Sequence, residues 1–552
     1  MQGLIKNEIG KGSIIEMKAF EVFKKEFIGI RDDIKEVYQR EWIYLIVLFV
    51  FAIFTYFIML TQDLTNTFDG LWTGNYYRAG SVEMGSGRWF WPYVDLLHFA
   101  VQSRPINVMI TLLMICTGLT LVKSQFPAKS KVCGYLAGLA YLGNVAVCVA
   151  LSYSYMSPVN GLGFLLGIFS AYIVIQSRNA LTGILYASIP LAFSLGLYQT
   201  YIENTAVILL IYMLYMICVG DDLKKLRDYI IKSIGTVIGG AVLYRILLEL
   251  HLRVLGLELS TYKGANTVSV SKMLKTLPYN LIRTYKEWIS YFCNNKFAHN
   301  MFQEKLPIFY AAVFLFLAII LIGITIGILK RGKFIETVLF VSAVLVIPVA
   351  ASFILLITTE ADVQIQMTNG FALVLPGYMY LFGAIAEKEQ GRSIRRKTIG
   401  TLWLLVCVAI AYGNFYMTIV DQEVMRDSKK ATTIISDSIL EDLKSYGYFT
   451  NKKPIAIVGQ ATASKVYKRS ALYGQSNIYA RIGLFWKPAA CMRMSWEGVF
   501  RDYTPCELTF CDDERYDEII KDSKFEDMPL FPESGYIADF GDTIVVKVSD
   551  EY

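Results

Sequence analysis

Apolar runs long enough to cross a bilayer recur along most of the chain, and polar connections separate them. A membrane-spanning helix needs about 20 consecutive, mostly apolar residues, and the pattern predicts about eleven such helices. This periodicity indicates a polytopic α-helical membrane protein. The predicted spans cover residues 42–60, 105–122, 132–151, 159–176, 181–197, 203–219, 229–250, 307–329, 335–358, 370–386 and 399–417.

The connections between these spans alternate in charge. The first 41 residues carry eight lysines and arginines, and every second connection after the first span is basic. The connections around 152–158, 198–204 and 359–369 carry no lysine or arginine. Because basic connections stay on the cytoplasmic side, we predict a cytoplasmic N-terminus and an extracytoplasmic tail in a multi-pass membrane protein. The basic connections contain residues 123–131, Arg178, 221–232, 330–333 and 387–397.

Composition agrees with this class, since 55% of the residues are hydrophobic and only 18% are charged. The net charge of +6 comes mostly from the cytoplasmic excess and indicates contact with anionic lipid, not nucleic acid. Residues 1–41 form a separate segment in which apolar residues recur near helical spacing, which predicts an amphipathic helix on the inner leaflet. No short apolar core with a cleavage site opens the chain, so the first span is predicted to be a retained anchor. The recurring apolar residues are Ile15, Phe20, Phe23, Phe27 and Ile30.

The transmembrane domain is therefore predicted over residues 42–420, with two long outer loops at 61–104 and 251–306. Short helices are predicted in the second loop, around SKMLKTLPYNLIRTYKEWISYF. Composition changes sharply after residue 420, and residues 421–552 are predicted to form a small extracytoplasmic α/β domain. Its pattern predicts a helix over 428–448 and strands over 453–459 and 541–549.

Cysteine and histidine offer little metal chemistry. Cys491, Cys506 and Cys511 lie in the outer domain, where a disulfide can form, and Cys506 with Cys511 is the favoured pair. With only three histidines in the chain and no CxxC or HExxH motif, a histidine-rich metal centre is excluded. A divalent ion would need converging oxygen ligands such as Asp63 and Asp69; we predict no required metal and no other cofactor.

The loop over 61–104 is the strongest candidate for chemistry, because membrane helices are usually joined by short hairpins. It gathers carboxylates, arginines and aromatic rings at what is predicted to be the outer surface. Activated sugars on that side are lipid-linked, so transfer to an acceptor hydroxyl needs a carboxylate base, cations for the leaving phosphate and aromatic faces that exclude water. The loop supplies all three groups: Asp63, Asp69, Glu83 and Asp95; Arg78, Arg88 and Arg104; Trp72, Tyr76, Tyr77, Trp89 and Trp91.

Short motifs in three regions of this chain, the first loop, a later outer boundary and the tail, resemble a known family. FDGLW (68–72) is followed by SGRWFW (86–91), GLYQTYI (196–202) adds a later outer boundary, and the tail holds KPIAIVG and DTIVVK. In this order they resemble the bacterial serotype-converting glucosyltransferases, multispanning enzymes of the type C glycosyltransferase class. The resemblance covers the chain from Trp42 onward. The chain departs from the family's pattern in having Phe68, an apolar residue, before the aspartate.

The resemblance implies transfer of a glucosyl or related hexosyl residue from a polyprenyl-phosphate sugar to a cell-surface glycan, with inversion and an aspartate base. It points to Asp69 as the base, with Asp63 as the alternative. Arg88, then Arg78 and Arg104, are the candidates for the donor phosphate. The candidates for contact with sugar or acceptor are Trp72, Tyr77, Glu83, Trp89, Trp91, Tyr198 and Gln199.

Each candidate also has a purely structural interpretation. Asp69 precedes glycine, a common turn pair, and Asp63 could cap the end of the first span. Arg88 and the tryptophans could anchor the chain at the membrane interface. Arg245 and Glu249, four residues apart on one helix face, most simply form an ion pair.

Three other functions share these features. A flippase for lipid-linked sugars would also be polytopic, but it should show internal repeats and charged groups at mid-membrane. A polysaccharide polymerase or ligase would depend on arginines, with Asp69 dispensable. A non-enzymatic scaffold would use the outer tail to bind a partner.

Overall fold

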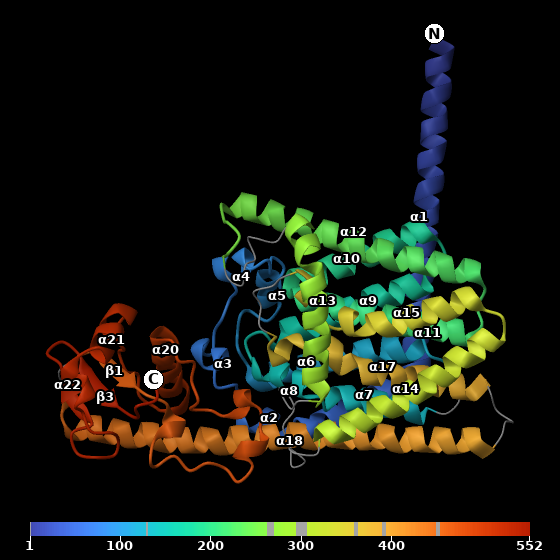
Figure 1. Cartoon of the computed structure of the whole chain (residues 1–552). Coiled ribbons are helices and arrows are strands. Elements are labelled where there is room, and N and C mark those ends of the chain that lie inside the picture. Colours follow the sequence, from blue (N-terminus) through green and yellow to red (C-terminus); the bar gives the residue numbers. More distant parts are fainter. Residues whose placement is uncertain are drawn as a thin grey trace.

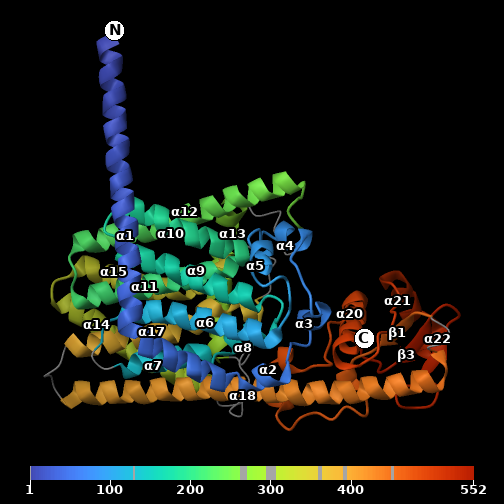
Figure 2. The same cartoon turned by 180° about the vertical axis from the view of Figure 1, so that it is seen from behind.

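The computed structural model describes residues 2–128, 131–261, 270–293, 306–357, 363–388, 394–448 and 453–552. Most of the long helices lie side by side in one bundle, and a smaller C-terminal domain stands at one end of it (Figures 1 and 2). The polytopic α-helical fold predicted from the apolar runs is confirmed.

Nine helices in the described residues are long and apolar enough to cross a membrane. A bent pair, α7 with α8, brings this number to ten, and the 17-residue apolar helix α15 accounts for the eleventh predicted run. The bend of 45° lies at Gly143–Asn144, where Asn144 caps α8 by accepting a hydrogen bond from the Ala146 amide at 2.9 Å. The helices of the bundle are α1 (Gln2–Thr55), α6 (Arg104–Ser124), α7 (Val132–Leu142), α8 (Val145–Ser152), α9 (Ser157–Gln176), α10 (Ala180–Leu197), α11 (Ile202–Val219), α12 (Leu223–Leu255), α14 (Leu306–Lys330), α15 (Phe334–Ala350), α17 (Asn369–Lys388) and α18 (Ile394–Ser445).

The connections around 152–158 and 198–204, which carry no lysine or arginine, gather with the long first loop at one end of the bundle, which we call the loop end. The Asn66 amide donates to the Ser152 carbonyl, Phe90 N to Gly196 O, and Ser260 N to Gly85 O. Residues 64–103, the turn between α8 and α9, the start of α11 and the end of α12 therefore meet there. The first loop itself contains α2 (Phe57–Gln62), α3 (Asp69–Trp72), α4 (Ser81–Gly85) and α5 (Trp91–Leu97).

Basic connections lie at the opposite end. Lys123 forms a buried ion pair with Glu41, and Lys232 donates to the Ser177 carbonyl at 2.7 Å. Helix α1 begins well clear of the bundle (Figure 2) and includes the predicted amphipathic segment. The alternation of basic and non-basic connections thus corresponds to the two ends of one bundle.

The second long loop differs from expectation. Its first residues continue α12, which ends at Leu255. Instead of short helices, its central part is one 24-residue helix, α13 (Val270–Cys293), which runs across the bundle helices in Figure 1. One face packs along its length: Asn280 donates to Leu356 O in the short helix α16 (Ile354–Ile357), and the Trp288 ring packs on Phe371. This continuous tertiary contact keeps the segment helical. The rest of the predicted loop, 262–269 and 294–305, lies outside the described residues.

The last span continues out of the bundle. Helix α18 is 52 residues long and extends along the C-terminal domain, so the predicted helix over 428–448 is its second half. Both predicted strands form, as β1 (Ile455–Val458) and β3 (Ile544–Lys547), which pair in parallel. A third strand, β2 (Ile537–Asp539), pairs with β3 antiparallel and was not predicted. Helices α20 (Ala489–Tyr503), α21 (Asp513–Ile520) and α22 (Ser523–Glu526) complete the domain.

Candidate active site at the loop end

Asp69 opens the short helix α3, directly beside the C-terminal domain. The Asn66 side chain fixes the turn before it, since Asn66 Oδ1 accepts from the amides of Phe68 and Gly70 at 2.9 and 3.2 Å. A Cβ at Gly70 would lie 2.1 Å from the Thr65 hydroxyl oxygen, so the turn requires glycine there. The Asp-Gly turn signal is therefore present, and it places a half-buried Asp69 at the surface of the loop end.

The charge of the Asp69 carboxylate reaches three buried tyrosines. Tyr153 and Tyr155 come from the turn between α8 and α9, and Tyr479 comes from the C-terminal domain. Burial, followed by the negative charge of Asp69, raises the pKa of Tyr155. The pKa values of Tyr153 and Tyr479 are also raised by burial, and the Asp69 charge contributes to both shifts. These tyrosines therefore stay protonated and can donate hydrogen bonds near the carboxylate.

Arg88 lies against two other aromatic rings of the loop end. Its guanidinium carbon lies 4.8 Å from the centre of the Tyr198 ring and 5.6 Å from that of Trp91. The positive charge of Arg88 opposes the Asp69 charge at Tyr155 and offsets part of the increase in the pKa of that tyrosine. Arg88 Nε is buried and has no hydrogen-bond partner among the described residues. The charges of Asp69 and Arg88 thus both reach Tyr155, and the guanidinium keeps an unused donor.

Tyr77 and Trp91 complete the aromatic lining. Their rings lie 4.9 and 5.9 Å from the ring of Tyr155. The Trp91 indole donates to the buried Asp95 carboxylate at 3.1 Å. Glu83 accepts from the Tyr77 hydroxyl at 2.5 Å and from the Gly80 amide at 2.8 Å, so it caps α4 while orienting Tyr77.

The other predicted residues lie elsewhere at the loop end. Asp63 and Arg104 form an ion pair at 2.9 Å, and Arg104 also binds Asp502 of α20 at 2.6 Å. Two carboxylates therefore neutralise Arg104, and this ion-pair network links the start of α6 to the C-terminal domain. Arg78 is exposed to solvent. The predicted pair Arg245–Glu249 forms.

Three side chains that were predicted to contact sugar or acceptor make contacts between elements of the protein itself. The Trp72 indole donates to the Ser495 hydroxyl of α20 at 3.1 Å. Trp89 is buried against Phe193 and His251. Gln199 donates to the Ser86 carbonyl at 2.9 Å and to the Tyr244 hydroxyl at 3.0 Å, so it ties the first loop to α12.

The structure adds four residues that sequence reasoning missed: Tyr153, Tyr155, Gln366 and Tyr479. Gln366 donates to the Tyr153 hydroxyl at 3.3 Å, and its own Oε1 is buried without a partner among the described residues. Buried polar atoms left without partners indicate water or a ligand. The motif SYSYMS at 152–157 was the available signal, since it places two tyrosines in a connection predicted to be outer.

The C-terminal domain packs against α3, the helix that begins with Asp69. Leu71 belongs to the hydrophobic core of that domain. Arg501 Nη2 donates to the Leu71 carbonyl at 2.5 Å, and a Cβ at Gly498 would lie 2.0 Å from the same oxygen. The Phe68 ring lies 4.3 Å from that of Trp486 and 5.2 Å from that of Tyr479. The position of Asp69 therefore depends on a domain more than 400 residues away in the chain.

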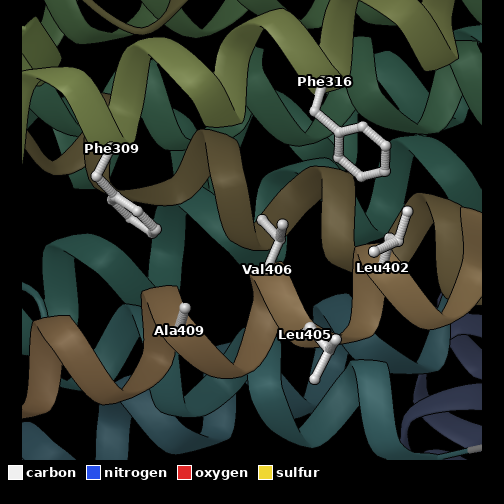
Figure 3. A pocket seen from close by; sticks show the side chains of 6 residues that line it. All are labelled: Phe309, Phe316, Leu402, Leu405, Val406 and Ala409. Atoms are coloured by element: carbon white, nitrogen blue, oxygen red, sulfur yellow. The ribbon is translucent and has the colours of Figure 1, made fainter.

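An apolar groove of about 320 Å³ opens between α14 and α18, lined by Phe309, Phe316, Leu402, Leu405, Val406 and Ala409 (Figure 3). It lies about 18 Å along α18 from Asp421, the residue that binds Asn477 beside Tyr479, at 1.5 Å per residue. With no polar lining, it offers room for a lipid chain and no chemistry.

Neither metal nor disulfide chemistry appears in the described residues. No group of three or more His, Cys, Asp or Glu side chains is arranged there to hold a metal ion. Cys506 and Cys511 both lie in the described ranges as free thiols, so the disulfide favoured from spacing is not formed.

A family model described as Glucosyl transferase GtrII matches residues 73–386, more than half of the chain. No curated protein and no solved structure gives a significant match.

Proposed function

The chain belongs to the GtrII glucosyl transferase family, and from this premise we propose that it transfers glucose from a polyprenyl phosphate to a cell-surface glycan, with Asp69 as the base. Membership makes the protein a glycosyltransferase and confirms the family that the motifs resemble. The matched range includes SGRWFW and GLYQTYI, whereas FDGLW and the tail motifs lie outside it. Because the members of this family are transferases, an enzyme is favoured over the flippase and scaffold alternatives. The donor, the acceptor, the stereochemistry and the membrane side belong to the proposal.

One observation carries the proposal: a continuous chain of aromatic rings joins the Asp69 turn to Arg88. Tyr479 packs on Phe68 beside Asp69, and Tyr153 and Tyr155 continue the chain. Trp91 stacks on Tyr155 and lies 5.6 Å from the Arg88 guanidinium carbon. An inverting transfer needs a base on one side of the sugar and a cation at the leaving phosphate on the other. Asp69 takes the proton of the acceptor hydroxyl as its oxygen attacks the anomeric carbon. The bond from that carbon to the phosphate oxygen breaks, and its electron pair leaves with the polyprenyl phosphate beside Arg88.

The aromatic lining supports sugar binding. Tyr77, Trp91 and Tyr198 present faces next to Arg88, and aromatic walls keep out the water that would hydrolyse the donor. The basic connections at the opposite end support a loop end that faces outward. The N-terminus and the basic connections then lie in the cytoplasm of a bacterium, while the C-terminal domain covers the outer face.

Asp69→Asn tests the base, with Asp63→Asn as the matched control in the same loop. Purified enzyme is supplied with radiolabelled polyprenyl-phosphate glucose and acceptor glycan, and transfer is measured in single turnovers. We expect Asp69→Asn to lower the rate by about 100-fold or more while Asp63→Asn stays near wild type, because Asp63 is more than half exposed and paired with Arg104.

The opposite pattern would assign the base to Asp63. Full activity in both variants, with strong loss in Arg88→Ala, would favour the polymerase or ligase alternative, which depends on arginine. An added chelator tests the predicted independence of metal, and a loss of transfer that Mg²⁺ or Mn²⁺ restores would contradict it.

A further inference from the structure

The C-terminal domain is divided by charge. Residues 465–487 contain five lysines and arginines and no acidic residue, whereas residues 502–552 contain fifteen acidic residues and four basic ones. We call the first segment the basic strip. Its basic residues are Lys465, Lys468, Arg469, Arg481 and Lys487.

The basic strip borders the candidate active site. Its Tyr479 and Trp486 pack on Phe68, the residue before Asp69, and Thr67 donates to the Leu484 carbonyl at 2.7 Å. Lys487 follows Trp486 directly and is exposed. The strip therefore forms the rim of the site on the side of the C-terminal domain.

Two arginines in the strip stack on one ring. The guanidinium carbons of Arg469 and Arg481 lie 5.3 and 4.8 Å from the centre of the Tyr473 ring. Arg481 is held in place because its Nη2 donates to the Ser476 carbonyl at 2.8 Å. Planar guanidinium groups beside an aromatic face suit a ligand that combines sugar rings with phosphate or carboxylate groups.

Acidic neighbours leave part of this charge uncompensated. Glu533 pairs with Lys465, Asp427 accepts from the Ser470 hydroxyl at 2.9 Å, and the Glu551 charge reaches Tyr473. Within the described ranges, Lys468 and Lys487 are exposed and form no ion pair. The strip thus keeps free positive charge next to the site.

The strip extends outward from the edge of the predicted bilayer: its Asn477 binds Asp421, about 6 Å along α18 from residue 417, and its Ile482 lies further out. Thr432 of α18 donates to the Ile482 carbonyl at 3.1 Å. The last predicted span ends at residue 417, so Thr432 lies about 22 Å further along α18 at 1.5 Å per residue. A ligand at this height is better matched by a glycan chain than by lipid headgroups.

We infer that the basic strip binds an anionic acceptor, a glycan chain bearing phosphate or carboxylate groups, and guides one of its hydroxyls to Asp69. This inference rests on the proposed function and names the class of acceptor. Several phosphate or carboxylate contacts at an exposed site should give binding that weakens as salt rises.

The test uses the full-length enzyme in detergent with three probes: fluorescent poly(glycerol phosphate), dextran of matched length, and vesicles containing phosphatidylglycerol. Lys468→Gln/Lys487→Gln removes two charges from the strip, and Lys444→Gln/Lys521→Gln removes two exposed charges elsewhere in the chain. We expect the wild type and the control variant to bind poly(glycerol phosphate) at low salt and dextran at least tenfold more weakly. The strip variant should bind poly(glycerol phosphate) at least fivefold more weakly than the control.

Equal binding by the strip and control variants would overturn the inference, as would equal affinity for dextran. Loss of vesicle binding alone would assign the strip to lipid. Turnover of polyprenyl-phosphate glucose by the wild type is measured separately. Its absence would refute the proposed function, whereas turnover with unchanged acceptor KM in the strip variant would refute only the acceptor assignment.

Discussion

Asp502 is the point at which the C-terminal domain holds the first loop, and replacing it tests that arrangement. Its side chain is 2% exposed and accepts from Arg104 at 2.6 Å and from Arg501 at 2.9 Å. Arg104 is itself 4% exposed, and Arg501 holds the carbonyl of Leu71 in α3. One buried carboxylate therefore organises the two guanidinium groups behind Asp69.

The expected cost of Asp502→Asn follows from burial. Removing one partner of a buried ion pair costs about 3–5 kcal/mol, because the remaining charge stays desolvated. An amide can still accept one hydrogen bond and Arg104 keeps Asp63, so we expect the lower end, about 3 kcal/mol. Asp63→Asn removes the more exposed partner of the same arginine and should cost about 1 kcal/mol or less.

The assay is thermal unfolding of the detergent-solubilised enzyme, followed by the fraction that stays monodisperse after heating. Asp502→Asn should lower the apparent Tm by about 3 °C and reduce transfer below that temperature, since α3 loses its support. Asp63→Asn should leave both close to wild type. Equal Tm values for the two variants would refute the argument that burial makes Asp502 the stronger partner.

Two further substitutions test the site from either side. Arg88→Ala should raise the KM for the polyprenyl-phosphate donor about tenfold or more, the worth of one charge-assisted hydrogen bond, and Arg88→Lys should restore part of the affinity; an unchanged KM would identify Arg88 as a membrane anchor. Gly498→Ala places a Cβ 2.0 Å from the Leu71 carbonyl, so α3 must shift and single-turnover transfer should fall severalfold. Gly474→Ala, where no atom lies within 4 Å of the added Cβ, is the matched control, and equal rates in these two glycine variants would contradict a rigid contact at α3.

Local patterns were sufficient for the membrane architecture. A span needs only a run of apolar residues, and the alternation of basic connections follows from the same one-dimensional order. The eleven predicted runs correspond to helices, and the strands at 455–458 and 544–547 were visible as short apolar runs near turn residues. The strand β2 was missed because three residues, Ile537–Asp539, carry too little pattern.

The sequence by itself determined a polytopic membrane glycosyltransferase with an oversized, chemically rich first loop, because runs, charges and short motifs are properties of neighbouring residues. Only the tertiary structure decided which members of that loop face one another. The Phe68–Asp69 turn packs on Tyr479 and Arg88 on Trp91 and Tyr198, whereas Arg104 binds Asp502 and Trp72 binds Ser495. Such choices depend on contacts between segments hundreds of residues apart, and no local spacing in the chain encodes them.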